Sequence, residues 1–148
     1  MGVNGNNDTV TGDIGNDTIW VAGNNDSVTG GTGNDLIGVN GNNDKVNAGP
    51  GNDTVYSSGD HNTVVGGGHD QIDLGGTNNT FLDSAPGYAD TVVGFDKAGG
   101  DRIDISATGH SVASMHLVNS NQDTLITLTG GSTILLKFVT NVDNSFFS

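Results

Sequence analysis

The sequence predicts an all-β fold in which the chain coils through two facing parallel sheets and ends in an antiparallel cap. Two observations support this prediction. Asp recurs every nine residues along the first part of the chain, and an apolar, usually β-branched, residue follows two positions after each. The composition also disfavours helices, because the chain has 25 Gly and no Glu.

The charge balance is strongly acidic. All 17 acidic residues are Asp, against 4 Lys and Arg, and the formal net charge is −13. Such a chain repels nucleic-acid phosphates and anionic lipid, whereas clustered carboxylates attract hard cations. No apolar run reaches the roughly 18 residues of a membrane span, and the lack of Cys excludes disulfides and Cys-ligated zinc. We therefore expect a monomer that binds calcium.

The repeat occupies residues 3–82 and alternates between two nonapeptide types. One type reads Val-x-Gly-Asn-Asn-Asp-x-Val-x, as at residues 21–29. The other reads Gly-Gly-x-Gly-Asn-Asp-x-Ile-x, best seen at residues 30–38. Because the types alternate, the structural unit is 18 residues, one turn of a right-handed solenoid, and all nonapeptides of one type stack in one sheet.

Each short strand points one apolar side chain toward the opposite sheet. One sheet is predicted to supply Val10, Val28, Val46, Val64 and Phe81, and the other Ile19, Ile37, Val55 and Ile72, with Val21 and Val39. In the turns, positive φ is assigned to Gly15, Gly33 and Gly51 in one type and to Asn6, Asn24 and Asn42 in the other. One buried apolar side chain per nine residues offsets only part of the entropy of ordering the backbone, so another interaction must hold the coil.

The missing interaction is predicted in the turns, where stacking aligns the aspartates. One column contains Asp17, Asp35, Asp53 and Asp70, and the other contains Asp8, Asp26 and Asp44, with Asn62 and Asn79 in the next places. Carboxylates one strand spacing apart, about 5 Å, repel each other unless a cation lies between them. Calcium suits such a site because it accepts six to eight carboxylate and carbonyl oxygens in flexible geometry.

The unit from Gly30 to Gly38, Gly-Gly-Thr-Gly-Asn-Asp-Leu-Ile-Gly, resembles the calcium-binding nonapeptide of repeats-in-toxin (RTX) proteins. The resemblance implies a parallel β-roll that is disordered without calcium and folds on binding several ions. It also implies carboxylate ligands from the aspartates of both columns, and main-chain carbonyl ligands around the first four positions of the nonapeptide. Those positions are Gly12, Gly30, Gly31, Thr32, Gly33, Gly49, Gly51, Gly66 and Gly67. Full sites are expected in the column of Asp17, and weaker or absent sites in that of Asp8, whose nonapeptides lack the first two glycines.

The period is lost after Leu82, and residues 83–148 are predicted to form a cap and a secretion-signal region. Short strands are expected at 90–96 and 101–106 around a Gly99–Gly100 turn, followed by a hairpin of 124–128 and 133–139. Phe81, Tyr88, Phe95 and Phe138 are candidates for closing the open end of the coil. This region is similar to the C-terminus of RTX proteins exported by type I secretion, with Phe146 and Phe147 after a final acidic residue. The similarity implies an extracellular protein and the type I secretion apparatus as a partner.

No catalytic constellation accompanies the repeats, since His61, His69, His110 and His116 have no fixed carboxylate or nucleophile partner. We therefore expect a non-enzymatic module of a longer protein, with any catalytic domain upstream, because Met1 opens almost inside a repeat.

A binding module is the alternative to a purely calcium-dependent folding role. Trp20, Leu36 and Tyr56 fall on the outer face of one sheet, where they could contact a polysaccharide or a cell surface. We expect instead that the C-terminal segment covers these aromatic residues, and burial of Trp20 would exclude the sugar. Residues 31–39 also resemble ice-binding adhesin repeats, although Ile14 and Pro50 interrupt the Thr ladder that such a surface needs.

Overall fold

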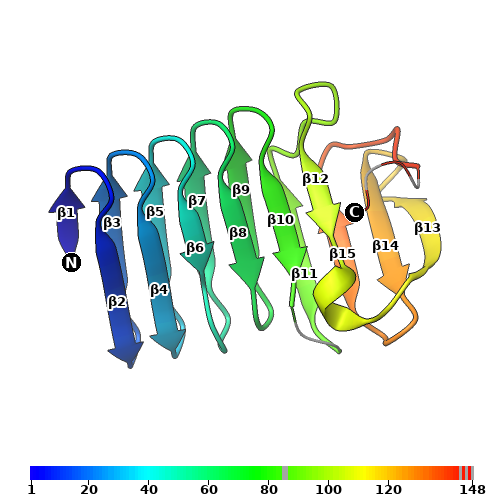
Figure 1. The fold of residues 1–148 in the computed structure, drawn as a ribbon. Coiled ribbons are helices and arrows are strands. Elements are labelled where there is room, and N and C mark those ends of the chain that lie inside the picture. The colour runs from blue at the N-terminus through cyan, green and yellow to red at the C-terminus, as the bar shows by residue number, and fades with distance from the viewer. Residues whose placement is uncertain (85–86, 144, 146, 148) are drawn as a thin grey trace.

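The computed structural model describes residues 1–84, 87–143, 145 and 147. The chain forms an elongated coil of parallel strands, with a group of antiparallel strands at its C-terminal end (Figure 1). The coil contains β1 (Gly2–Asn4), β2 (Thr9–Ile14), β3 (Thr18–Ala22), β4 (Ser27–Thr32), β5 (Leu36–Asn40), β6 (Lys45–Asn47), β7 (Thr54–Ser58), β8 (Thr63–Gly66), β9 (Gln71–Gly75), β10 (Thr80–Asp83), β11 (Ala89–Val93) and β12 (Arg102–Asp104). The short 3-10 helix η1 (Ser106–Thr108), β13 (Val112–Val118), β14 (Asp123–Leu128) and β15 (Thr133–Leu136) follow.

The strands alternate between two sheets along the chain. One sheet has the order β1-β3-β5-β7-β9-β11-β15-β14-β13, and the other β12-β10-β8-β6-β4-β2. Ile19 pairs with Ile37, and Val10 with Val28, so residues eighteen apart lie side by side. The prediction of two nonapeptides per turn, with one sheet for each type, is confirmed.

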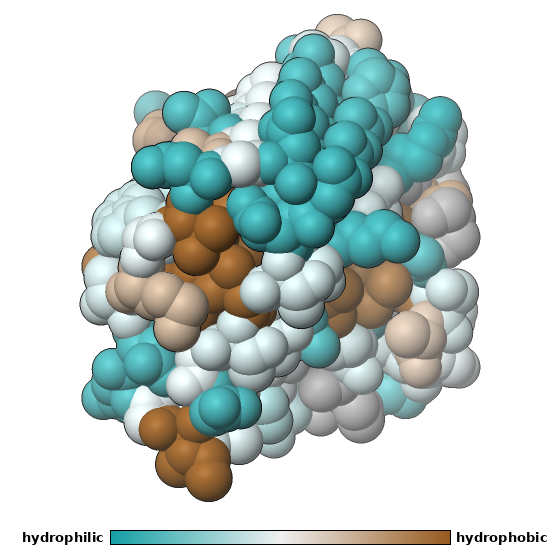
Figure 2. All heavy atoms as spheres, turned by 60° about the vertical axis from the view of Figure 1, so that its left-hand side comes forward, coloured by the Kyte–Doolittle hydropathy of each residue, from teal (hydrophilic) through white to brown (hydrophobic). Residues whose placement is uncertain are grey.

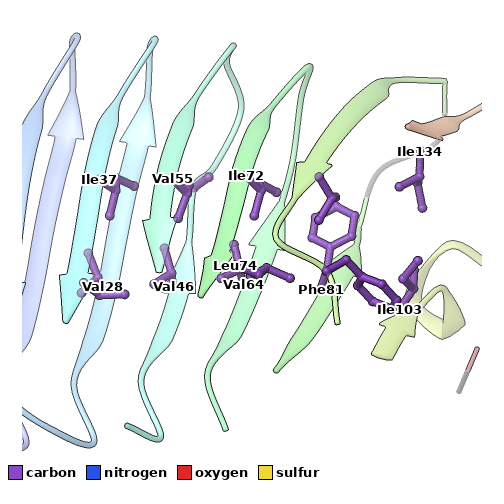
Figure 3. Packing of buried hydrophobic residues seen from close by; sticks show 14 of the residues in the cluster. Val28, Ile37, Val46, Val55, Val64, Ile72, Leu74, Phe81, Ile103 and Ile134 are labelled. Carbon is purple, nitrogen blue, oxygen red and sulfur yellow. The ribbon is translucent and has the colours of Figure 1, made fainter. Parts of the chain in front are cut away.

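The core is the seam between the two sheets. Figure 3 shows Ile37 and Val55 on one sheet and Val28 and Val46 on the other, all pointing into the same narrow space. Every core residue expected from the repeat is buried, and Leu74 joins them. Figure 2 shows the N-terminal end of the coil, where hydrophobic atoms lie open between hydrophilic turns, and Val3 is only partly buried at this end.

The turns differ from the prediction in both types of nonapeptide. Gly15 and Gly33 have positive φ as expected, but Gly51 does not, so that assignment was wrong. In the other type, positive φ falls on Asn7, Asn25 and Asn43, one residue later than expected, so the equivalence drawn between the glycines and the preceding asparagines was wrong. The preceding asparagines have another role. The Oδ1 of Asn6 accepts the backbone N–H of Asn24 at 2.8 Å, and the Oδ1 of Asn24 accepts that of Asn42 at 2.8 Å. A ladder of side-chain amides therefore ties successive turns together on the outside.

The parallel stacking continues after the nonapeptide period is lost. β11 pairs with β9 and β12 pairs with β10, on either side of the predicted turn at Gly99–Gly100. β15 then adds parallel to β11, and β14 and β13 follow antiparallel. The hairpin of β14 and β15 was predicted, although β15 ends at Leu136 rather than Val139. β13 was not predicted.

Two of the four aromatic residues expected to close the coil do so. Phe81 and Phe95 are buried, whereas Tyr88 is 41% and Phe138 is 73% exposed, so that expectation was wrong for the latter two. Phe147 packs against the core and bridges to Ile103, while Phe146 lies outside the described residues. None of the helices in the described ranges is long and apolar enough to cross a membrane.

Candidate metal centre

Stacked aspartates line both sides of the roll, each immediately before a strand. In the first column, the Oδ1 of Asp35 accepts the backbone N–H of Asp17 at 2.8 Å, and the Oδ1 of Asp53 accepts that of Asp35 at 2.7 Å. In the second column, Asp26 accepts from Asp8 at 2.8 Å, and Asp44 accepts from Asp26 at 2.9 Å. One oxygen of each of these accepting carboxylates is therefore held by the turn before it.

The second carboxylate oxygen is buried without a donor. Within the described residues, no hydrogen-bond partner reaches the Oδ2 of Asp8, Asp17, Asp26, Asp35, Asp44 or Asp53. Asp70 differs, because its Oδ2 accepts the N–H of Gly67 at 2.9 Å. A buried anionic oxygen with no donor is costly, and a cation is one of the few groups that can satisfy it.

Main-chain oxygens from a neighbouring turn face these orphaned atoms. A methyl group added at Gly30 would lie 2.4 Å from the carbonyl oxygen of Ala48 and 2.5 Å from the Oδ2 of Asp35. At Gly12 it would meet the carbonyl oxygen of Gly30 at 2.3 Å and the Oδ2 of Asp17 at 2.8 Å. The missing side chain at the first nonapeptide position thus leaves a space between oxygens of two turns, which suits a cation.

In the second column, the glycine at the third position brings the main chains of successive turns into close contact beside the carboxylate. A methyl at Gly23, in the third position, would lie 1.4 Å from the carbonyl oxygen of Gly5 and 3.0 Å from the Oδ2 of Asp26. Both columns therefore offer carboxylate and carbonyl oxygens, although the first two glycines are replaced in one of them. The weaker binding expected for that column stays a prediction.

The electrostatics of the columns show a shortage of positive charge. Burial raises the pKa of Asp53 to about 6, and the neighbouring carboxylates of Asp70 and Asp35 raise it further, against backbone donation from Asp35. Burial also raises the pKa of Asp44, with Asp26 adding to the effect. No group of three or more His, Cys, Asp or Glu side chains in the described chain is arranged to hold a metal by itself. A cation here would need main-chain carbonyls as well as carboxylates.

The family model of the RTX calcium-binding nonapeptide repeat matches residues 3–37 and 39–68, in four copies. The repeat region is an RTX β-roll. Its nonapeptides bind Ca2+, with several ions along the repeats. The chain is also similar in fold to the AlgE6R2 subunit of the Azotobacter vinelandii mannuronan C5-epimerase, with a TM-score of 0.55 and 16% sequence identity over 99% of this chain and 91% of that one. No curated protein sequence matches the chain.

The RTX β-roll places the other predicted glycines at close contacts between turns. A methyl at Gly31 would lie 1.9 Å from the carbonyl oxygen of Asp13, at Gly49 it would lie 2.0 Å from that of Gly31, and at Gly51 1.7 Å from that of Gly33. The carbonyl oxygen of Thr32 accepts the N–H of Gly15 at 2.8 Å, and that of Ala48 accepts the N–H of Gly31 at 3.3 Å, so each has one lone pair left for a cation.

The last Gly-rich turn departs from this pattern. A methyl at Gly66 would lie 2.9 Å from the Oδ2 of Asp70, and one at Gly67 would lie 2.7 Å from the carbonyl oxygen of Gly49. The Oδ2 of Asp70, which faces Gly66, accepts the N–H of Gly67. In this turn, therefore, a backbone donor of the turn itself already satisfies one oxygen of the carboxylate.

Two members of the columns were missed in the sequence. The Oδ1 of Asp90 accepts the N–H of Asp70 at 2.9 Å, and the Oδ1 of Asp101 accepts that of Asn79 at 2.7 Å. Both aspartates are buried, and burial raises the pKa of Asp90 to about 7. Their spacing could have revealed them in the sequence, because Asp90 and Asp101 each stand two residues before a buried apolar residue, as the aspartates of the repeats do.

The outer face of the RTX β-roll carries the exposed aromatic residues. Trp20 is 49% and Tyr56 is 43% exposed, and they line a shallow hollow with Gly38 between them, while Leu36 is partly buried. The ring of Trp20 lies over Gly38, whose added methyl would come within 2.1 Å of it. The antiparallel strands lie at the other end of this sheet and do not cover Trp20, so the expected coverage by the C-terminal segment was wrong for the described residues.

Proposed function

We propose that this chain is a calcium-triggered folding module of a secreted protein, unfolded where calcium is scarce and folded in the extracellular medium. The observation that carries the proposal is the set of buried carboxylate oxygens in both columns that have no donor and face carbonyl oxygens of a neighbouring turn. Folding without a cation would leave all of these acceptors unsatisfied. The roll is therefore expected to form only when cations are available.

The residues that would hold the ions are the column aspartates and the carbonyls beside them. In the first column these are Asp17, Asp35 and Asp53 with the carbonyls of Gly30 and Ala48. A bound Ca2+ supplies positive charge and coordination to oxygens that otherwise repel one another. The aspartates then hold successive turns together, which adds to the thin apolar seam.

In the second column the corresponding groups are Asp8, Asp26 and Asp44 with the carbonyls of Gly5 and Gly23. The strength of such sites fits a switch between compartments. Extracellular calcium modules have dissociation constants of about 10⁻⁴ to 10⁻³ M. Because the ligands come together only in the folded chain, the free energy of binding is free energy of folding.

The antiparallel strands β13 to β15 are proposed to cap the roll. An open parallel sheet exposes unpaired strand edges, which promote association with other chains. β15 covers the edge of β11, and Ile126, Leu128, Ile134 and Leu136 bury an apolar surface against the end of the seam. This arrangement supports a role in ending the coil and in stabilising the larger protein that carries it.

The test is far-UV circular dichroism of the chain in excess chelator, followed by titration with calcium to about 10 mM and with magnesium as control. A cooperative gain of β signal with calcium alone is expected. Full β structure in chelator would contradict the folding switch.

Export is tested separately, because the last residues are proposed to carry a type I secretion signal. The chain with and without residues 142–148 is expressed in a bacterium that has a type I apparatus, and the medium is assayed. Loss of export from the shortened chain is expected, with calcium-dependent folding retained in vitro. Equal export of both chains would contradict the signal.

A further inference from the structure

We propose that Asn62 and Asn79 replace calcium in the second column, so that their amide groups close two turns of the roll without a cation. The proposal rests on the calcium-dependent folding described above and adds a selection rule to it. A turn in which the Oδ2 of the sixth-position Asp has no donor within the described residues takes an ion, whereas a turn with buried Asn at that position supplies the missing donor from its own side chain.

The orientation of Asn62 is fixed by the ladder. Its Oδ1 accepts the backbone N–H of Asp44 at 2.8 Å, as the Oδ1 of an aspartate does one turn earlier. The amide nitrogen is therefore placed where the aspartates have Oδ2. From there it donates to the carbonyl oxygen of Gly41 at 3.0 Å and to the Oγ of Ser57 at 3.2 Å. Asn62 is fully buried, so these bonds replace contacts with water.

The equivalent atoms in the aspartate turns are two acceptors. The carbonyl oxygen of Gly5 and the Oδ2 of Asp26 both lie within 3.0 Å of the point where a methyl at Gly23 would be, and the Oδ2 of Asp26 has no donor in the described structure. The same holds one turn later for Gly23 and Asp44, with the Oδ2 at 3.2 Å from a methyl at Gly41. An amide N–H facing a carbonyl is self-sufficient, whereas a carboxylate facing a carbonyl needs a cation.

Asn79 repeats this arrangement one turn later. Its Oδ1 accepts the N–H of Asn62 at 2.8 Å, and its Nδ2 donates to the carbonyl oxygen of Gly75 at 3.1 Å. It too is fully buried. The acceptor is in its own turn, but the effect is the same, since the amide satisfies a carbonyl inside the column.

The two sides of the roll consequently differ in the C-terminal half. Along the first column carboxylates continue through Asp53, Asp70 and Asp90, while the second column has amides until Asp101. The N-terminal half has unpartnered carboxylates in both columns. Calcium would therefore be bound on both sides near β1 to β6 and on one side near β7 to β10.

The experiment counts the calcium ions bound at 10 mM calcium by native mass spectrometry and by calorimetry, for the wild-type chain and Asn62→Asp. The variant is expected to bind one ion more than the wild type and to require more calcium for folding. The control is Asn47→Asp, which adds the same charge on the exposed outer face of β6 and is expected to leave the count unchanged.

The reverse change replaces Asp44 by a neutral residue. Comparison of Asn with Ala at this position tests whether the amide donor matters or whether any neutral side chain is tolerated. Asp44→Asn is expected to bind fewer ions than the wild type but to melt above Asp44→Ala, because only Asn restores a donor toward the carbonyl of Gly23. An unchanged count in Asn62→Asp, or equal melting of the two Asp44 variants, would overturn the proposal. A wild-type chain that binds no calcium would instead contradict the proposed function, so the two failures are distinguishable.

Discussion

Asp35 in the roll and Asp123 in the cap are both buried, but they are satisfied differently. Asp123 accepts hydrogen bonds from the Nζ of Lys137 at 2.9 Å and from the backbone N–H of Phe138 at 2.9 Å, and from the amide of Asn119. These donors lower its pKa to about 2, with Asn119 making the largest contribution. Asp35 has one backbone donor for Oδ1 and none, within the described chain, for Oδ2.

The difference separates two ways of stabilising a fold. The cap brings its own cation and donors to its buried carboxylate, so its stability is a property of the chain. The roll leaves carboxylate oxygens for an ion from solution, so its stability depends on calcium concentration. Four changes to the chain or its solution test this contrast, with effects of decreasing size.

The largest effect is expected from removal of calcium. In chelator, backbone amides of β2 to β8 should exchange with solvent at nearly the rate of an unfolded chain, because both carboxylate columns then repel. In calcium the same amides should be protected many-fold. Hydrogen–deuterium exchange with mass spectrometry measures both states. Protection of the roll in chelator, with exchange in the cap, would contradict the claim that only the roll depends on calcium.

A methyl group placed between the Oδ2 of Asp35 and the carbonyl oxygen of Ala48 should have the next largest effect. In Gly30→Ala the new methyl would lie 2.4 Å from the carbonyl oxygen of Ala48, a main-chain atom that cannot rotate away. We expect calcium affinity to fall about 10- to 100-fold, as measured by calorimetry. Gly2→Ala is the control, because a methyl there has no neighbour within 4 Å. Equal calcium binding by the two variants would contradict a calcium site between Asp35 and Ala48.

The two buried aspartates can be compared directly by the same substitution. Asp123→Asn replaces a carboxylate that accepts from three donors by an amide that has only one acceptor oxygen, so it is expected to lower the free energy of unfolding equally with and without calcium. Asp35→Asn should instead lower the calcium sensitivity of folding. Urea unfolding at several calcium concentrations measures both, and the distinction fails if the two variants respond alike to calcium.

The smallest effect concerns pH in calcium-free solution. Burial raises the pKa of Asp53 to about 6 and that of Asp90 to about 7, whereas an unfolded Asp titrates near 3.9. Between these values the folded chain binds more protons than the unfolded chain, so its stability is greatest below about pH 4 and is lost as the pH rises through 6–7. Circular dichroism in calcium-stripped buffer should show more β signal at pH 4.5 than at pH 7.5. An equal or smaller signal at the lower pH would contradict the assignment.

The repeat made most of the roll predictable, because a fixed nine-residue spacing determines which residues face the seam and which stack in the turns. Ile19, Ile37 and Val55 needed no knowledge of distant contacts, since each is placed by the strand that contains it. The same spacing brought the aspartates into columns. The left-handed asparagines were misplaced by one residue because Asn6 and Asn7 are chemically identical, and only the backbone path distinguishes them.

The cap could be predicted only in part, because its contacts are between residues far apart in the sequence. The hairpin of β14 and β15 followed from local alternation around a Gly-rich turn, but the parallel addition of β15 to β11 did not. The exposure of Phe138 was missed because aromatic character alone does not say whether the seam reaches that residue. The continuation of the columns to Asp90 and Asp101 was visible in their spacing but was hidden by the irregular segments between them.

The pairing of residues eighteen apart also bears on how such a chain can change in length. Gain or loss of two nonapeptides returns every later residue to the same sheet and the same column, so a gene can lengthen or shorten by that unit while the fold is kept. Gain or loss of a single nonapeptide would move all later strands to the opposite sheet and exchange the two kinds of turn. Duplication in pairs is therefore the step that selection can accept.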